Sequence, residues 1–478
     1  MIPLTVAELA RVLGARTLGA DERAVAVDGR LVTDVMTDSR VPAAGPAVFF
    51  ALRTDRADGH AFVAAAAAAG ALVAVVDERA ASSTHRAVDA TPTLLAVEDV
   101  WAALGRLARH VVAQVGCRVV AITGSYGKTT VKDLAAAALG CDRRVVASHA
   151  SFNNELGVPL TMLAVTPDID VLVAEAGARN AGDLRLLGGL LRPDVAIVSA
   201  VGPVHLETFG DLEGVAEEKA QLVASLGEGG TAVLNADDRR VVTMTRGAHR
   251  VVTVSAEGAP ADVRAQEVTI DAMGRVRAAV RTPWGDARIA LPMPGAHHLT
   301  NALLALAAAG IEGVDVTDAA AAIAEARTSP SRAALHHVAG VTVLDDAYNA
   351  SPPTVLGALR TLADLPCEGR RWAVLGVMAE LGPTAHAQHV AVGRACREAV
   401  DELVVVGDAA AGLAEGAADG IGAPKVHRVT DHAEAAALVV AAVRPGDTVL
   451  FKASRVATLD LAAAAVLDGL GVREGVRA

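Results

Sequence analysis

The stretch from Val119 to Thr130, with the sequence VVAITGSYGKTT, constrains the fold more than any other part of the chain. An apolar, branched run leads into the glycine loop Gly124–Gly127, and Lys128 then precedes a helical-looking stretch. A strand, a glycine loop and a helix start are typical of phosphate binding, because glycines let backbone N–H groups approach an anion and the helix N-terminus adds positive potential. The lysine can reach terminal phosphates, and a threonine hydroxyl can hold Mg²⁺.

The loop does not satisfy the strict eight-residue phosphate-loop pattern. Ile122 stands where the first glycine of that pattern belongs, which leaves a shortened Gly-x-x-Gly-Lys-Thr-Thr loop. Two interpretations stay open at this point: a nucleotide-binding loop, or an ordinary glycine-rich turn between a strand and a helix.

Composition limits the class of protein. A chain of 478 residues suggests about three domains. Hydrophobic residues make up 52% and aromatic residues only 2%, so we expect aliphatic cores. The net charge of −12 argues against general binding to nucleic acid or to anionic membranes. Four scattered cysteines without CxxC spacing make disulfide and zinc sites poor interpretations, and a reducing cytoplasm is expected.

The N-terminal stretch contains no signal-peptide pattern. Thr5 to Glu8 reads instead as a capping box that opens a short helix. The most apolar stretch, residues 61–76, is short and contains Gly70, so we predict a helix followed by a strand. We therefore expect a cytoplasmic protein without membrane insertion.

Polar residues follow three strand-like runs in the middle of the chain. They are Glu175, His205 and Asn235, each placed after a buried-looking run of the parallel-sheet type. Ligands of open α/β sheets lie beyond the carboxyl ends of the strands, so these side chains and Thr129 could meet in one crevice. The alternative is that each is a loop residue whose hydrogen bonds are satisfied locally.

Alternating strand and helix signals predict an α/β fold with three domains. Residues 1–112 form a small α/β domain, in which the polar clusters Asp38–Arg40 and Asp58–His60 read from composition as turns. Residues 113–328 form a central phosphate-loop-like domain with a mostly parallel sheet and helices. Residues 329–478 form a smaller, doubly wound, Rossmann-like domain.

Four stretches together resemble the Mur ligase superfamily. They are Thr123–Thr130, Phe152–Leu160 (FNNELGVPL), Asp345–Pro352 (DDAYNASP) and Glu380–Gly382. The resemblance covers the whole chain and is strongest for the branch that adds D-alanyl-D-alanine to UDP-N-acetylmuramoyl-tripeptide in peptidoglycan synthesis. The D-N-P-R stretch that is common in the sister ligase is absent.

The resemblance implies a reaction in two steps. A substrate carboxylate attacks the γ-phosphate of ATP to give an acyl phosphate, and an amine then displaces phosphate. Two anions must approach each other, so Mg²⁺, with two ions expected, and cations are needed. The residues implied for ATP binding are Gly124, Ser125, Gly127, Lys128, Thr129, Thr130, Asn301, Arg332 and Asp346.

The resemblance also implies a metal set and a modified lysine. The metal ligands would be Thr129, Glu175, His205 and Lys219, the last as a carbamate formed with CO₂. From local sequence alone, Lys219 is an ordinary solvated helix lysine. The implied catalytic residues are Lys128, His205 and Lys219.

Substrate contacts are implied in all three domains. UDP-sugar contacts fall on Asp38, Ser39 and Arg40, and further substrate contacts fall on Asn153, Asn154, Tyr348 and Asn349. The first domain would bind the UDP substrate, and the last would close on ATP and bind the incoming amine. We expect small-molecule substrates only, no nucleic acid, and a monomer.

Four positions depart from the family pattern. They are Thr54, His298, Val377 and Ala453. They motivate an alternative, a ligase of the same fold with a changed acceptor or amine, for example in secondary metabolism. A non-catalytic nucleotide-binding protein is a third hypothesis, against which the intact Lys128, Glu175 and His205 argue.

Overall fold

A computed structural model describes residues 1–18, 28–80, 84, 92–418, 420 and 422–477. The chain divides into two units, which are described separately. Unit 1 comprises Met1–Val119, Arg143–Ala174 and Gly189–Leu191, and unit 2 comprises Val120–Asp142, Glu175–Gly188 and Arg192–Ala478. In the described part of the chain, no helix is both long and apolar enough to cross a membrane.

Unit 1 begins with a five-stranded sheet in the order β2-β7-β6-β5-β4, in which β4 to β7 are parallel and β2 is antiparallel to β7. The predicted capping box is confirmed, because the Thr5 hydroxyl accepts from the Glu8 amide and the Glu8 carboxylate accepts from the Thr5 amide. The strands are β1 (Leu4–Thr5), β2 (Arg16–Leu18), β3 (Leu31–Val32), β4 (Asp34–Met36), β5 (Ala47–Phe50), β6 (Ala71–Asp77) and β7 (Thr93–Val97), and the helices are α1 (Val6–Leu13), η1 (Gly59–Phe62), α3 (Val63–Ala68) and α5 (Val100–Val115).

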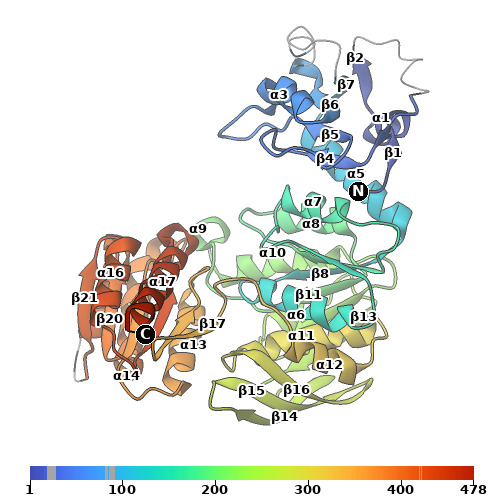
Figure 1. Cartoon of the computed structure of the whole chain (residues 1–478). Helices are drawn as coiled ribbons and strands as arrows, with labels where there is room; N and C mark the ends of the chain where they lie inside the picture. The colour runs from blue at the N-terminus through green and yellow to red at the C-terminus, as the bar shows by residue number, and fades with distance from the viewer. Residues whose placement is uncertain (19–27, 81–83, 85–91, 419, 421, 478) are drawn as a thin grey trace. The chain divides into compact units, whose positions relative to one another are not determined.

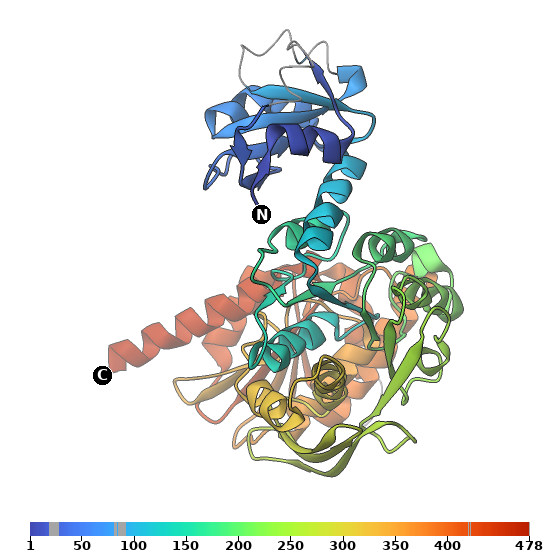
Figure 2. The ribbon, with the colours of Figure 1, turned by 90° about the vertical axis from the view of Figure 1, so that its right-hand side faces the viewer.

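Helix α5 (Val100–Val115) begins and ends at residues that favour helix termini. Asp99 caps its first turn, and Gly116 ends it with a φ of +71°, which a glycine adopts without strain. Figure 2 shows α5 as one unbroken helix that follows the N-terminal strands. The domain boundary predicted near residue 112 falls inside this helix, and the domain limits stay a prediction.

The central sheet has nine strands in the order β16-β15-β14-β13-β12-β11-β8-β10-β9. Strands β8, β11, β12, β13 and β14 pair in parallel, as expected, whereas β14, β15 and β16 form an antiparallel ribbon that the sequence analysis did not predict. The strands are β8 (Arg118–Thr123), β9 (Val145–Ala147), β10 (Val171–Glu175), β11 (Val195–Val198), β12 (Thr231–Asn235), β13 (Arg250–Ser255), β14 (Val263–Ile270), β15 (Arg275–Thr282) and β16 (Gly285–Pro294).

Helix α11 is the buried helix of unit 2. It packs between α6 and strands β12 and β13, with α12 beside it (Figure 1), and it is apolar on nearly all sides. The helices of this region are α6 (Lys128–Gly140), α7 (Gly157–Leu163), α8 (Asp183–Leu191), α9 (Leu206–Phe209), α10 (Leu212–Ala224), η2 (Val241–Thr243), α11 (His298–Ile311) and α12 (Val316–Ala324).

The last part of the chain is the doubly wound sheet that the sequence predicts. Its order is β17-β18-β22-β19-β20-β21, with β17 alone antiparallel and with Trp372 and Phe451 in the core. The elements are β17 (Ala334–Val338), β18 (Val341–Asp345), α13 (Pro352–Asp364), β19 (Arg371–Leu375), η3 (Gly382–Thr384), α14 (Ala385–Ala399), β20 (Glu402–Val406), η4 (Asp408–Ala410), α15 (Ala411–Ala418), β21 (Lys425–Val429), α16 (His432–Ala442), β22 (Thr448–Lys452), η5 (Arg455–Ala457) and α17 (Leu459–Arg477).

Candidate functional site

The glycine loop after β8 has the conformation that close approach requires. Gly124 has a φ of +147°, and a Cβ there would lie 2.0 Å from Ser199 Oγ. Gly127 has a φ of +82°, and a Cβ there would lie 2.6 Å from Asn301 Oδ1. Larger residues would therefore be strained and would clash at both positions. The loop is held tightly between the end of β11 and helix α11.

Helix α6 begins at Lys128, immediately after the loop. The first backbone N–H groups of a helix have no acceptor within the helix, and here they belong to Lys128, Thr129 and Thr130. The Lys128 ammonium donates to Gly124 O at 2.8 Å, so it folds back over the loop. Burial lowers the pKa of Lys128, and the nearby Glu175 carboxylate partly offsets this effect. The arrangement suits an anion at the helix N-terminus.

Thr129, Glu175 and Arg332 meet at this helix end. Thr129 Oγ1 donates to Glu175 Oε2 at 2.7 Å and accepts from the Arg332 guanidinium at 2.8 Å. Thr129 and Glu175 are only 2% and 1% exposed. A hydroxyl, a carboxylate and a cation from residues far apart in the chain are thus gathered beside the loop.

Arg332 is presented by an unusual backbone. Its neighbours Ser331 and Ala333 have φ values of +55° and +53°, in the left-handed region. Ser331 Oγ donates to Asp345 Oδ2 at 2.8 Å, and the Ala333 amide donates to Asp346 Oδ1 at 3.2 Å. These bonds hold a backbone that would otherwise relax, which is typical of functional positions.

Two strand-end residues support the loop and do not face a ligand. Ser199 Oγ donates to Tyr126 O at 2.5 Å, and Asn235 Nδ2 donates to Ser199 O at 3.1 Å. The Ser125 hydroxyl donates to Gly202 O at 3.2 Å and accepts from the Gly202 amide at 2.9 Å. Asn235 therefore lies near the predicted crevice, but as a satisfied loop residue, the alternative that the sequence had left open.

Lys219 is not the solvated helix lysine that local sequence suggests. It lies on α10, is only 1% exposed, and has no hydrogen bond or ion pair among the described residues. Burial, reinforced by the charge of Lys128, lowers its pKa to about 7. Its neighbour Glu218 accepts hydrogen bonds from the Gly182 and Leu184 amides at the start of α8. These two bonds explain why the Glu218 carboxylate does not pair with the Lys219 amine.

His205 lies after β11 and contacts a carboxylate from the last part of the chain. His205 Nδ1 is 2.6 Å from Glu380 Oε2. The hydrogen bond from His205 lowers the pKa of Glu380. The rings of His205 and Phe209 have centroids 6.3 Å apart, and Lys219 Nζ lies 6.0 Å from the centroid of Phe209. His205 and Lys219 therefore both lie around Phe209.

Asn301 and His298 lie together on the first turn of α11. Asn301 Nδ2 is 3.3 Å from His298 Nδ1, and both residues are 7% exposed. Burial lowers the pKa of His298 well below its usual value, and the neighbouring His297 adds to this effect. Asn301 packs directly against Gly127, as a base-contacting residue next to a phosphate loop would.

The other predicted residues of the last part gather around Tyr348. The Arg332 guanidinium lies 4.1 Å from the centroid of the Tyr348 ring, a cation–π distance. Lys452 Nζ forms an ion pair with Asp346 and donates to Asn349 O at 3.1 Å. Tyr348 therefore contacts Arg332, whereas Asp346 and Asn349 share Lys452 as a partner.

The remaining predicted residues lie in unit 1. Asp38 and Arg40 form a local ion pair, and Arg40 lowers the pKa of Asp38 to about 2. Asn154 Oδ1 accepts from the Gly157 amide at 2.9 Å at the start of α7. Ser39 and Asn153 lie beside these residues in the sequence.

The residues present fit a magnesium ion that is bound partly by protein side chains and partly by a phosphate. Among the described residues, no group of three or more His, Cys, Asp or Glu side chains forms a metal cage. Thr129 Oγ1 and Glu175 Oε2 nevertheless supply two adjacent hard oxygens. Mg²⁺ typically keeps several waters and binds one or two carboxylates plus substrate phosphates, so this donor set suits it.

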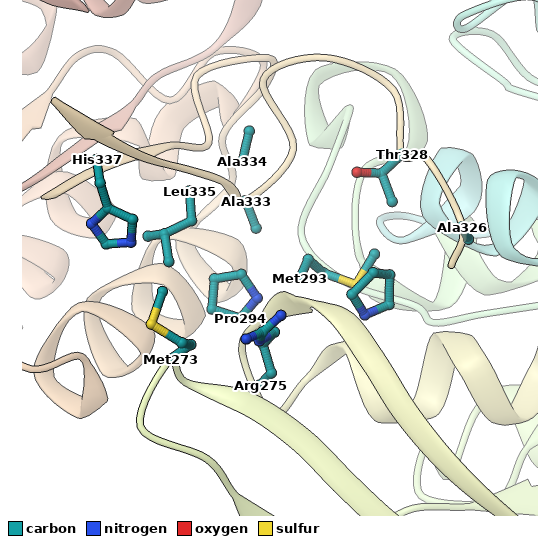
Figure 3. Close-up of a pocket in the computed structure, with 11 residues that line it drawn as sticks. Met273, Arg275, Met293, Pro294, Ala326, Thr328, Ala333, Ala334, Leu335 and His337 are labelled. Carbon is teal, nitrogen blue, oxygen red and sulfur yellow. The ribbon is translucent and has the colours of Figure 1, made fainter. Parts of the chain in front are cut away.

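A separate cavity lies between the antiparallel ribbon and the start of the last sheet (Figure 3). Its lining includes Met273, Arg275, Pro294, Leu335 and His337. None of the residues predicted for the site lines it, although Ala333 at its rim is next to Arg332. This cavity is distinct from the phosphate loop.

Sequence reasoning missed three residues that shape the site. Ser199 holds the loop, Glu380 contacts His205, and His389 accepts from the Met378 amide at 2.9 Å. Ser199 could have been found, because it ends a strand that neighbours the phosphate-loop strand. Glu380 lies in the Glu380–Gly382 stretch that carries the family resemblance, but no role was assigned to it, and no local pattern marks His389.

The phosphate loop lies at the carboxyl end of a strand in a mostly parallel sheet. A carboxylate and an arginine form hydrogen bonds with the threonine that follows the loop. This arrangement defines a nucleotide-binding α/β protein. Residues 122–309 match the Mur ligase middle domain, and residues 331–455 match the Mur ligase glutamate ligase domain. The UDP-N-acetylmuramoyl-tripeptide–D-alanyl-D-alanine ligase of Mycobacterium tuberculosis is 40% identical over 509 aligned positions, covering 98% of each chain.

Solved structures agree. The chain is similar to MurF from Acinetobacter baumannii, with a TM-score of 0.85, 28% identity and coverage of 98% and 99% of the two chains. MurF from Thermotoga maritima, solved in complex with ADP, gives a TM-score of 0.79 and 26% identity, with 94% and 99% covered. The chain therefore belongs to the Mur ligase family, in the branch that contains these D-alanyl-D-alanine ligases.

Proposed function

We infer that this protein is an ATP-dependent ligase that joins D-alanyl-D-alanine to UDP-N-acetylmuramoyl-tripeptide in peptidoglycan precursor synthesis, releasing ADP and phosphate. The observation that carries this inference is the 40% identity to a ligase of this name along the full length of both chains. The alternative with a changed acceptor or amine is not favoured, because the four departures lie within a chain that matches from end to end. Its substrates are small molecules, and we expect a monomer.

The site geometry supports a phosphoryl transfer to a carboxylate. We propose that Lys128 and the N–H groups of α6 hold the terminal phosphates of ATP, with Arg332 adding a second cation. Gly124, Ser125, Gly127 and Thr130 shape that cradle. One substrate carboxylate oxygen attacks the γ-phosphorus, the bond to the β-γ bridging oxygen breaks, and ADP leaves.

Magnesium completes the charge balance of this step. When bound, Mg²⁺ neutralises the charge that develops on the transferred phosphoryl group. Thr129 and Glu175 would hold the first ion, and His205 with Lys219 would hold the second. Asn301 would contact the adenine, and Asp346 would position the closing segment through its bonds to Lys452 and the Ala333 amide.

The second step forms the amide bond. The dipeptide amine attacks the acyl carbon, phosphate leaves, and the amine loses a proton. We propose that Tyr348 and Asn349 contact the incoming amine, and that Asp38, Ser39, Arg40, Asn153 and Asn154 contact the UDP-sugar peptide. On this proposal, residues 1–112 bind the UDP substrate, residues 113–328 bind ATP, and residues 329–478 bind the amine.

Lys219 has the properties that carbamylation needs. Only a neutral amine attacks CO₂, and a pKa of about 7 leaves a large neutral fraction near neutral pH. The amine nitrogen bonds to the CO₂ carbon and one proton leaves, so the neutral amine becomes an anion that can ligate a metal. Labelling with ¹³C-bicarbonate should place a carbamate signal in the wild type and none in Lys219→Ala.

Phosphate release from ATP tests the function. We expect release only when both UDP-N-acetylmuramoyl-tripeptide and D-alanyl-D-alanine are present, and weaker release with other amines. Lys128→Ala should abolish it while circular dichroism shows an intact fold, which would also dispose of the non-catalytic hypothesis. Release that depends on neither substrate would reject the ligase assignment.

A further inference from the structure

Glu380 comes from a distant part of the chain and contacts the start of helix α9, at His205 and Leu206, through two bonds. His205 Nδ1 lies 2.6 Å from the Glu380 carboxylate, and the Leu206 amide donates to Glu380 O at 3.2 Å. Beside them, a Cβ on Gly382 would lie only 3.2 Å from Glu207 Cγ. Side chain and backbone of Glu380 therefore both fix the start of helix α9.

The segment that carries Glu380, residues 376–382, is itself held from behind. The Met378 amide donates to His389 Nε2 at 2.9 Å, and the Ala379 amide donates to Ser454 Oγ at 2.9 Å. His389 is 1% and Ser454 is 3% exposed. Two buried side chains thus anchor the backbone immediately before Glu380, so its carboxylate is presented from a fixed point.

Both partners adopt a backbone that non-glycine residues rarely use. His205 has a φ of +52° and Glu380 a φ of +63°. Such a conformation is strained for a non-glycine residue and persists only where surrounding contacts impose it. A left-handed residue at each end of one hydrogen bond indicates that the contact is maintained for its geometry.

The contact selects one tautomer of the imidazole ring. A carboxylate only accepts hydrogen bonds, so His205 Nδ1 must carry a proton in this arrangement. The lone pair of a neutral ring is then on Nε2, which has no hydrogen bond among the described residues. A carboxylate behind a histidine is the usual device for orienting a metal-binding ring and making it more basic.

Stability does not account for this ion pair. The side chains of His205 and Glu380 are 24% and 53% exposed. An ion pair so open to water contributes little to folding. We therefore attribute its role to the orientation that it gives the imidazole ring.

We propose that Glu380 is a positioning residue, which fixes the orientation and tautomer of His205 so that Nε2 faces the second metal position. The inference rests on the proposed function, in which His205 is a metal ligand. On this proposal, His205 is oriented for metal binding only when the 376–382 segment lies beside it. Glu380 itself contacts neither the reacting atoms nor the metal.

Binding of Mn²⁺ tests this directly. Wild type, Glu380→Gln and Glu380→Ala would be titrated with Mn²⁺ at saturating ADP, with free Mn²⁺ followed by electron paramagnetic resonance. We expect the weaker of two Mn²⁺ affinities to fall by about 10–100-fold in Glu380→Ala. Glu380→Gln keeps an acceptor oxygen and should fall less. Phosphate release should need more Mg²⁺ but recover its kcat at saturation.

Glu415→Gln is the matched control. It removes another exposed contact between a histidine and a glutamate, His386 Nε2 to Glu415 Oε2 at 3.2 Å, elsewhere in the last part of the chain. Its Mn²⁺ affinity and activity should equal those of the wild type.

Unchanged Mn²⁺ binding in Glu380→Ala would overturn the proposal. A loss of kcat in the same variant that added Mg²⁺ does not restore, with normal Mn²⁺ binding, would assign Glu380 a different role and would overturn it as well. A wild type without phosphate release would reject the ligase function alone, because the Mn²⁺ titration reads Glu380 independently.

Discussion

Replacing Lys219 by methionine should stabilise the protein at neutral pH while abolishing catalysis. Methionine keeps a long apolar side chain but removes an amine that is 1% exposed and has no ion-pair partner among the described residues. Burial lowers the pKa of Lys219 from 10.5 to about 7. Between these two values the unfolded chain binds the proton and the folded chain does not, so the folded state loses stability as pH falls from 10.5 to 7.

The magnitude follows from the two pKa values. At about 1.4 kcal/mol for each pH unit, a difference of about 3.5 gives an upper limit of about 5 kcal/mol at pH 7 and below. Lys219→Met should recover a large part of this free energy of unfolding at pH 7. Near pH 10.5 most of this gain should vanish, because the lysine is then neutral in the folded state and only half protonated in the unfolded state.

Urea unfolding in CO₂-free buffer at pH 7 and pH 10 measures the difference. Removing CO₂ matters because a carbamate would change the charge of the wild type. Hydrogen exchange of peptides from α10 would localise the effect. Lys132→Met is the control: Lys132 is 3% exposed but paired with Asp133 at 2.7 Å, so its loss should destabilise the fold. Equal stability of Lys219→Met and wild type at pH 7 would refute the reasoning.

Two further predictions concern the loop and α11. Gly124→Ala should weaken the binding of an ATP analogue, measured by calorimetry, by roughly 100-fold or more. The added Cβ would meet Ser199 Oγ at 2.0 Å, and a φ of +147° strains alanine. A near-normal affinity would contradict this prediction. The buried His298 has a lowered pKa, so the unfolded chain binds its proton first and stability falls as pH drops below about 6.5. In His298→Asn, the loss of unfolding free energy between pH 6.5 and 5.5 should be smaller by up to about 1 kcal/mol, and an unchanged pH slope would contradict this.

Local patterns predicted the parts of the fold that local forces determine. The capping box at Thr5 and the glycine loop after β8 are set by neighbouring residues, and both occur where predicted. The antiparallel ribbon was missed although β15 (Arg275–Thr282) shows the alternation of one buried face. Buried parallel strands appear in a sequence as continuous apolar runs. A strand with one solvent-exposed face alternates between polar and apolar residues, so it contains no such run.

Contacts across long sequence separations could not be predicted in the same way. Nothing near His205 indicates that Glu380 will meet it, because their approach depends on how two sheets pack. Likewise, the local sequence of Lys219 describes a charged helix residue, and only tertiary burial turns it into an amine with a pKa of about 7. The family resemblance singled out Lys219, but composition and spacing did not.

The carboxyl edge of the central sheet places polar residues together without deciding what each one does. Thr129, Glu175 and Asn235 all follow strands or the loop at that edge. Asn235 uses its amide to bind Ser199 O, and its side-chain oxygen accepts from the Asp237 amide, so its hydrogen-bonding capacity is spent on the scaffold. Glu175 instead meets a threonine hydroxyl that also accepts from an arginine. A carboxylate oxygen beside a threonine hydroxyl is the kind of donor that a cation with bound phosphate requires. Whether a strand-end residue is scaffold or ligand therefore depends on whether its partners are backbone groups of the fold or the polar side chains of the site.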